Sequence, residues 1–173
     1  MPGMPRMRFS LLIPVVYLAG ACRSPERASV AVDTGPASAS AIGLGHKPSF
    51  IGAPPGAVDE VVRQAQARAT LEGKRLVVYD GAPWCDPCRR FHEALQSGQL
   101  DEELPSVTFL EFDNDRDRER LIAAGYKSVY IPLFALPGPD GRSSRRQVEG
   151  GSAGEGAATE IAQRLSGLLA SAR

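Results

Sequence analysis

The chain has 173 residues, a length typical of a single domain. Its 20 basic residues balance its 20 acidic residues, and 43% of the chain is hydrophobic. This composition supplies an ordinary core and excludes a nucleic-acid binder that depends on surplus positive charge. Three cysteines are too few for a small fold stapled by several disulfides, and an odd number leaves one cysteine to be explained.

The first 21 residues have the pattern of an export signal. Arg6 and Arg8 precede an apolar segment of about 11 residues, which as a helix would cross only about half of a ~30 Å hydrocarbon core. Small residues then lead to Cys22. We therefore expect residues 1–21 to be a signal peptide and the rest of the chain to lie outside the cytoplasm, in the cell envelope or periplasm.

The end of this segment, Leu18–Cys22 with the sequence LAGAC, resembles the lipobox of bacterial lipoproteins. It departs from that pattern at Ala19, where a large aliphatic residue is usual. The resemblance implies that Cys22 is lipidated and anchors the protein to a membrane, which would account for the odd cysteine. A signal cleaved near Ala21, or a signal retained as an anchor, are alternatives.

Residues 22–55 are rich in Ala, Ser, Gly and Pro and show no sustained periodicity, so we expect them to form a flexible tether. A short apolar stretch at residues 42–50 could add an edge strand, although its glycines weaken that prediction. The folded domain is expected over residues 56–173.

Within that domain, helical and strand patterns alternate along the chain. Apolar residues at helical spacing begin at Val58 and stop before Gly73, and the run 75–79 is typical of a buried central strand. The further expected elements are a helix from about Cys85, a strand at 107–112, a helix at 115–124, strands at 132–136 and 143–149, and a C-terminal helix around 161–169. This order predicts an α/β fold with a partly parallel sheet and an antiparallel hairpin at its edge.

One motif carries chemistry. Trp84–Cys88 reads WCDPC and lies where the first central strand gives way to a helix. Two cysteines three residues apart at a helix start fall within one turn, close enough for a disulfide. The helix N-terminus offers unpaired N–H groups and a positive dipole end, both of which stabilise a Cys85 thiolate. Pro87 suits the first helical turn because its missing N–H would have no partner there.

From about Val58 to Arg173 the chain resembles the thioredoxin superfamily. The resemblance rests on three features in order: the strand 76–79 leading into WCDPC, the strand 107–112 ending at Asp113, and Tyr126 followed by YIPLF at 130–134. It implies a thioredoxin-like three-layer sandwich, in which helices cover both faces of a mixed central sheet. It also implies that the Ile131–Pro132 bond is cis and faces the cysteine pair.

The resemblance further implies a thiol–disulfide oxidoreductase in which Cys85 attacks and Cys88 resolves. Trp84, Ile131 and Pro132 would form the substrate-binding surface, with client proteins carrying thiols or disulfides and an unidentified redox protein as partners. The cysteine pair would be its own redox centre, with no other cofactor and no metal. Pro87 beside the second cysteine resembles reductive members, so the reductive direction is favoured.

Two residues depart from the family pattern. Thioredoxins place a buried aspartate six residues before the first cysteine, where it assists proton transfer from the second, and this chain has Tyr79 there. The adjacent Asp80 should point to the other face of the strand. Asp86, between the cysteines, places a negative charge beside the Cys85 thiolate, so we expect a smaller drop in the Cys85 pKa than in strongly oxidising relatives.

Three other interpretations stay open. The cysteine pair could be an inert structural disulfide, since an exported chain meets an oxidising compartment. Cys85, Cys88 and His92, with His46 in the tether as a further ligand, could form a copper or zinc site of a metallochaperone, although a lone helical histidine is more often solvated or capping. The domain could also be a binding module in which the charged run 113–120 holds calcium, but that run lacks the required glycine and terminal glutamate, and alternating charges favour a solvated helix face.

Overall fold

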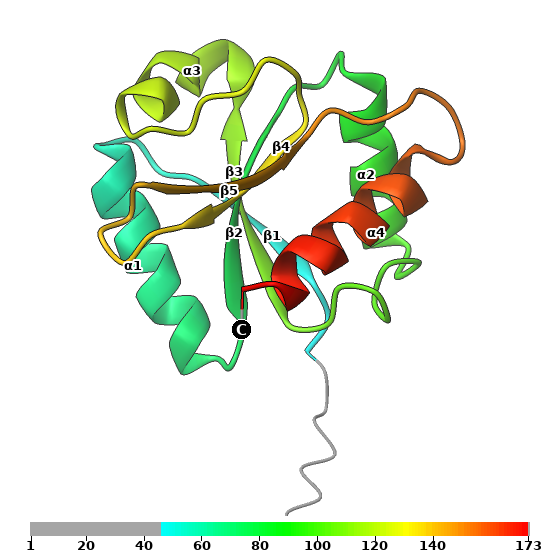
Figure 1. The fold of residues 1–173 in the computed structure, drawn as a ribbon, viewed down its shortest axis with the longest axis horizontal. Coiled ribbons are helices and arrows are strands. Elements are labelled where there is room, and N and C mark those ends of the chain that lie inside the picture. The colour runs from blue at the N-terminus through cyan, green and yellow to red at the C-terminus, as the bar shows by residue number, and fades with distance from the viewer. Residues whose placement is uncertain (1–45, 173) are drawn as a thin grey trace, which may run out of the picture. The chain divides into compact units, whose positions relative to one another are not determined.

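The computed structural model of the chain describes residues 46–172. A five-stranded sheet lies between two pairs of helices (Figure 1). The elements follow the order β1 (Ser49–Gly52), α1 (Val58–Leu71), β2 (Arg75–Gly81), α2 (Asp86–Gln96), β3 (Val107–Asp113), α3 (Asn114–Ala123), β4 (Leu133–Pro137), β5 (Ser143–Glu149) and α4 (Ala157–Ala170). The expected thioredoxin-like three-layer α/β sandwich is therefore confirmed.

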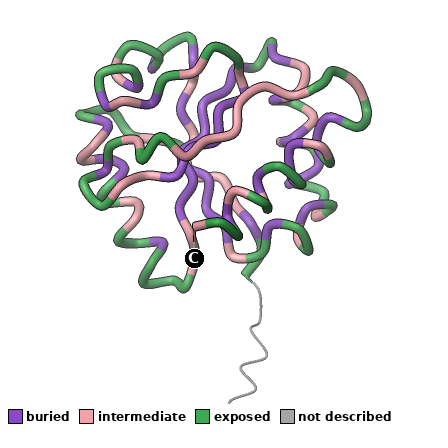
Figure 2. Tube along the Cα trace, in the orientation of Figure 1, coloured by how far each residue is buried: buried purple, intermediate pink, exposed green. Residues whose placement is uncertain are grey.

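The sheet has the strand order β1-β3-β2-β4-β5. β1 and β2 each pair in parallel with β3, whereas β4 runs antiparallel to both β2 and β5. This is the mixed sheet, with a hairpin at one edge, that the order of patterns predicts. β2 lies at its centre, so it is buried on both faces along almost its whole length (Figure 2).

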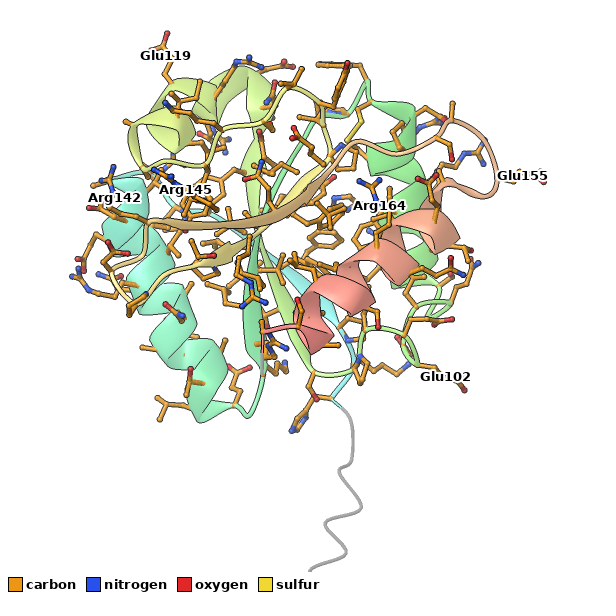
Figure 3. The ribbon with its side chains drawn as sticks, in the orientation of Figure 1. Glu102, Glu119, Arg142, Arg145, Glu155 and Arg164 are labelled. Carbon is orange, nitrogen blue, oxygen red and sulfur yellow. A yellow bond between two sulfur atoms is a disulfide. The ribbon has the colours of Figure 1, made fainter. Side chains whose placement is uncertain are left out.

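Two hydrophobic clusters hold the layers together, one on each face of the sheet. α2 and α4 pack on one face around Phe91, Phe109 and Ile161, and α1 and α3 pack on the other around Val62 and Leu121. Figure 1 shows the same division of the helices about the sheet. Charged side chains such as Glu102, Glu119 and Glu155 project outward from it (Figure 3).

The strand β1 takes up part of the segment expected to be a tether. Ser49–Gly52 pairs with residues 108–111 of β3, and the Phe50 ring packs against the core on the α2 side. The edge strand suggested by the apolar stretch is thus present, and the last residues of the range 22–55 belong to the sheet rather than to a linker. The expected signal peptide and Cys22 lie outside the described residues. No helix within residues 46–172 is long and apolar enough to cross a membrane.

Candidate functional site

The cysteine pair lies at the junction of β2 and α2. β2 ends at Gly81, and Cys85 is the N-cap of α2 in an extended conformation. Cys85 and Cys88 form a disulfide, with their Cα atoms 5.3 Å apart. The Cys85 sulfur accepts a hydrogen bond from the backbone N–H of Cys88 at 3.3 Å. A first-turn N–H of α2 thus points at this sulfur, the arrangement that stabilises a thiolate.

Asp86 is turned outward and its charge is paired. Its carboxylate accepts a hydrogen bond from Arg89 at 2.7 Å and another from the backbone N–H of Gly154 at 3.1 Å, and Arg90 lies 3.6 Å away. The Gly154 hydrogen bond, followed by that from Arg89, lowers the pKa of Asp86. The sequence indicated the negative charge beside Cys85; the structure adds two arginines of the same helix that partly offset it.

The loop before β4 covers the disulfide. The Ile131–Pro132 peptide bond is cis, as the resemblance implied. Ile131 packs against the small cluster formed by Ala82, Cys85 and Cys88. Just before it, the backbone N–H groups of residues 129 and 130 both donate to one carboxylate oxygen, Oε2 of Glu149, at 2.7 and 3.2 Å. The edge strand β5 therefore fixes the loop that lies against the sulfurs.

Large apolar side chains are exposed on both loops of the site. Trp84 is 67% exposed, Val129 78% and Tyr130 67%, values unusual for residues of this size. The indole N–H of Trp84 donates to Asp115 at the start of α3, at 2.9 Å, so the ring is held in place although it faces solvent. Exposure of this kind suits a surface that contacts another chain.

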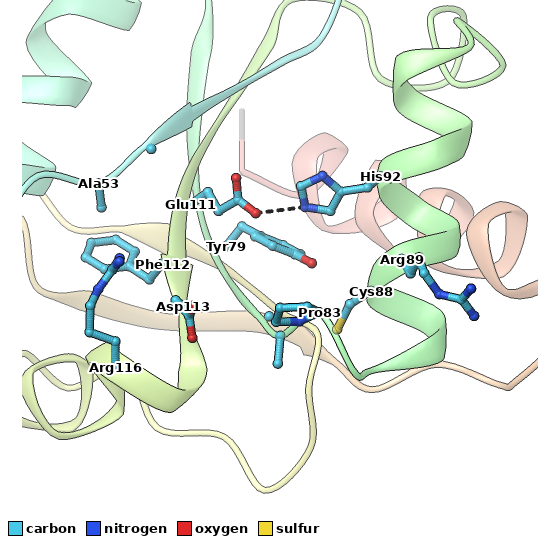
Figure 4. Close-up of a pocket in the computed structure, with 13 residues that line it drawn as sticks. Ala53, Tyr79, Pro83, Cys88, Arg89, His92, Glu111, Phe112, Asp113 and Arg116 are labelled. Carbon is cyan, nitrogen blue, oxygen red and sulfur yellow. Dashed lines mark ion pairs between the residues drawn. The ribbon is translucent and has the colours of Figure 1, made fainter.

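A cavity of about 650 Å³ opens behind Cys88, on the side of β1 and β3 (Figure 4). Tyr79, Pro83, Cys88, Arg89, His92 and Glu111 are among the residues that line it. His92 donates from Nε2 to Glu111 at 2.9 Å, and its ring stacks on Phe50 with centroids 3.9 Å apart.

The solvated or capping role suggested for His92 is therefore wrong, because its ring stacks on Phe50 of β1 and donates to Glu111 of β3. Burial, then the charges of Glu111 and Asp80, raise the pKa of the Tyr79 phenol above its ordinary value, so Tyr79 keeps its proton. Glu111 was not among the site residues that the sequence predicted. The spacing of His92, one turn after Cys88, was the available signal that both share a face of α2.

The run 113–120 is not the freely solvated helix face that its alternating charges suggested. Asp117 is 2% exposed and accepts hydrogen bonds from Arg116, Arg120 and the backbone N–H of Asp113. Asn114 is buried as well, and its amide donates to the Asp80 carboxylate at 2.8 Å. These polar contacts connect α3 to the end of β2. They leave no calcium loop, since arginines fill the positions around Asp117.

The suggested metal ligands are not brought together. Within residues 46–172 no group of three or more His, Cys, Asp or Glu side chains is arranged to hold a metal ion. His92 is engaged by Glu111 rather than turned to the sulfurs, and His46 precedes β1, where its backbone N–H donates to Ser106. The described part of the chain thus offers no ligand set for the copper or zinc interpretation.

No family model matches the chain, and no curated protein matches it in sequence. Among solved structures, it is similar to a thioredoxin from Arabidopsis thaliana in the oxidized state, with 19% identity over 70% of this chain and 97% of that one and a TM-score of 0.43. A Trichomonas vaginalis thioredoxin gives 18% identity over 69% and 95%, with a TM-score of 0.44. A Fasciola hepatica thioredoxin gives 25% identity over 62% and 94%, with a TM-score of 0.41.

Proposed function

We propose that this domain, whose fold is thioredoxin-like, is a thiol–disulfide oxidoreductase that exchanges disulfides with client proteins through Cys85 and Cys88. One observation carries the proposal: the Cys85 sulfur caps α2 and accepts the N–H of the cysteine with which it is bonded. The same contacts would stabilise Cys85 as a thiolate once the disulfide is reduced. A purely structural staple does not require that placement.

The exchange runs in two steps. The Cys85 thiolate attacks one sulfur of a client disulfide, forming a mixed disulfide and releasing the other client sulfur as a thiolate. Cys88 then loses its proton and attacks the Cys85 sulfur, which re-forms the Cys85–Cys88 disulfide and releases the second client thiolate. The client gains two electrons and the domain loses two, so a dithiol reductant must recharge the pair after each turnover.

The division of roles follows from position in the helix. Cys85 caps the N-terminus next to the exposed loop of Trp84 and is 5% exposed, whereas Cys88 lies inside the first turn and is 1% exposed. We therefore propose that Cys85, the more accessible of two buried cysteines, attacks the client and that Cys88 is close enough to resolve the mixed disulfide. We propose that the client chain lies along the loop of Ile131 and Pro132 in extended form, beside the exposed side chains of Trp84 and Tyr130.

We favour the reductive direction because Pro87 precedes the second cysteine as in reductive thioredoxin-like proteins. The equilibrium potential of the pair against glutathione tests this direction. A value near about −270 mV supports reduction of clients, and a value near about −120 mV would make the domain an oxidant. We also propose that the protein works outside the cytoplasm, tethered to a membrane, on the strength of the N-terminal sequence pattern.

Reduction of insulin by dithiothreitol, with and without the protein, tests the activity. We expect the wild-type domain to accelerate the reaction and the Cys85→Ser variant to lose all acceleration. The Cys88→Ser variant should instead accumulate mixed disulfides through Cys85, visible as adducts that disappear on reduction. An inert structural disulfide would give no acceleration and no adducts, and that result would overturn the proposal.

A further inference from the structure

Cys88 and His92 lie one helical turn apart on α2 and line the same cavity (Figure 4). At about 650 Å³ this cavity has room for several water molecules, each of which takes about 30 Å³ in the liquid. The Cys88 thiol is otherwise shut off from solvent, with 1% of the residue exposed. A proton that leaves Cys88 therefore has this cavity as its outlet.

The His92 ring is held in one orientation. Its Nε2 donates to Glu111 at 2.9 Å, and the ring lies parallel to Phe50 with an interplanar angle of 2°. Tyr79 meets it edge-on, with centroids 5.4 Å apart. Because the carboxylate fixes the proton on Nε2, the second ring nitrogen, Nδ1, is left as a base.

The other polar groups that line the cavity are engaged elsewhere. Arg89 is bonded to Asp86 and Arg116 to Asp117, and neither guanidinium accepts protons. The Asp113 carboxylate accepts the first-turn N–H of Asp115. Tyr79 is buried and keeps its phenolic proton, because burial raises its pKa. Besides Asp113, which caps α3, the His92–Glu111 pair is the base that lines the cavity, and His92 shares helix α2 with Cys88.

We propose that His92, oriented by Glu111, accepts the Cys88 proton during resolution of the mixed disulfide. The proposal rests on the thiol–disulfide exchange proposed above. The S–H bond of Cys88 breaks, and its proton passes through water in the cavity to the His92–Glu111 pair, which then holds it as an imidazolium beside a carboxylate. The electron pair left on Cys88 forms the new bond to the Cys85 sulfur, and the client sulfur leaves as a thiolate. When the Cys85–Cys88 disulfide is next reduced, Cys88 takes up a proton again.

A two-step reaction separates this role from the chemistry of Cys85. Every protein in this experiment carries Cys22→Ser, which removes the third thiol. The reduced protein is mixed with dithiobis-nitrobenzoate, a disulfide that releases one coloured thiolate in each of the two steps. Attack by Cys85 releases the first thiolate, and resolution by Cys88 releases the second. In His92→Gln, which retains a hydrogen-bonding group but no titratable base, we expect the first release to be unchanged. The second should slow about tenfold or more near neutral pH, with its pH profile moved to higher pH.

Further variants keep the proposal falsifiable. Glu93→Gln changes an exposed residue of the same helix and should leave both releases unchanged. Glu111→Gln leaves the Phe50–His92 stack in place and should slow only the second release. The double variant Glu111→Gln/His92→Gln should show the same rate of second release as His92→Gln alone. Wild-type rates and pH profile for the second release in His92→Gln would overturn the role of His92. Absence of the first release in the wild-type protein would overturn the exchange activity itself.

Discussion

The phenol ring of Tyr79 covers the α-carbon of Gly81, two residues further along β2. A methyl group on Gly81 would overlap the Tyr79 hydroxyl and the ring atoms next to it. Residues two apart on a strand share a face, so the large side chain at 79 requires the absence of one at 81. The position that carries a small acid in thioredoxins is thus filled here by a ring that a glycine accommodates.

We predict that Gly81→Ala destabilises the protein by about 1–3 kcal/mol, because the Tyr79 ring, which lines the cavity, must move to make room for the added methyl group. Urea unfolding measures the loss. The matched control is Gly167→Ala in α4, where an added methyl group meets nothing within 4 Å. That change should be neutral or stabilising by up to about 1 kcal/mol, as expected for an exposed helix interior. Equal stability of the Gly81→Ala and wild-type proteins would contradict the overlap.

Asp117 gives a second prediction, because its charge is held between two arginines. Burial alone would raise its pKa, but hydrogen bonds from Arg116 and Arg120 outweigh burial and hold the pKa well below its usual range. A carboxylate whose pKa is lower in the folded protein than in the unfolded chain stabilises the fold at pH values above its unfolded pKa of about 4. That contribution to the free energy of unfolding falls as the protein is acidified. Asp117→Asn should therefore cost about 2–3 kcal/mol at neutral pH and progressively less below about pH 4.

Urea unfolding of this variant across the acidic range provides the measurement. Glu119→Gln is the control on the same helix, since the Glu119 side chain projects into solvent (Figure 3). Its unfolding free energy should match that of the wild-type protein within about 0.5 kcal/mol at every pH. A loss in Asp117→Asn that stays constant down to strongly acid pH would show that packing, rather than charge, holds Asp117 in place.

The sequence was a sufficient guide wherever local chemistry decides the structure. The alternation of helical and strand patterns predicted the order of elements, and the WCDPC motif at a strand-to-helix junction placed Cys85 as a helix cap. Gly73 and Gly125 follow the ends of two expected helices, and both adopt the positive φ that glycine tolerates at a helix C-terminus. In each case the relevant residues are close together in the chain.

The sequence was a poor guide wherever the partner comes from another element. His92 lies on α2 and Glu111 on β3, and periodicity reports only which face of an element a residue occupies. The burial of Asp117 escaped prediction for a different reason, because its arginine partners, one residue before it and three after, lie on the same helix and hold its carboxylate between them. Opposite charges in sequence do not reveal which pair is enclosed.

The proposed lipid anchor at Cys22 gives a third prediction. Expressed in a bacterial host with its N-terminus intact, the protein should partition into the detergent phase of a detergent–water separation. Cys22→Ser should move it to the aqueous phase, because each buried methylene of an acyl chain adds about 0.8 kcal/mol to membrane binding. Cys85→Ser retains the anchor and serves as the control. If the wild-type protein partitioned into the aqueous phase, the proposal of a lipid anchor would be wrong and a plain cleaved signal would remain.

Asp80 gives the fourth prediction, and its sign is opposite to that of Asp117. Asp80 is 3% exposed, and one of its carboxylate oxygens has no hydrogen-bond partner, while the other accepts from Asn114. Burial raises its pKa to about 6, although the Asn114 hydrogen bond works in the other direction. The folded protein therefore holds this proton more tightly than the unfolded chain does. Ionisation of Asp80 costs stability as the pH rises from about 4 to about 6, and the cost is fully present above that range.

Asp80→Asn keeps an acceptor for Asn114 and removes the buried charge. We expect it to raise the free energy of unfolding by about 1–3 kcal/mol at pH 8, and to make no difference below about pH 4, where Asp80 is protonated in both states. Urea unfolding at a series of pH values measures the difference, with Glu119→Gln again as the exposed control. A variant that is less stable than the wild-type protein at pH 8 would show instead that the ionised carboxylate binds Asn114 strongly enough to offset its burial.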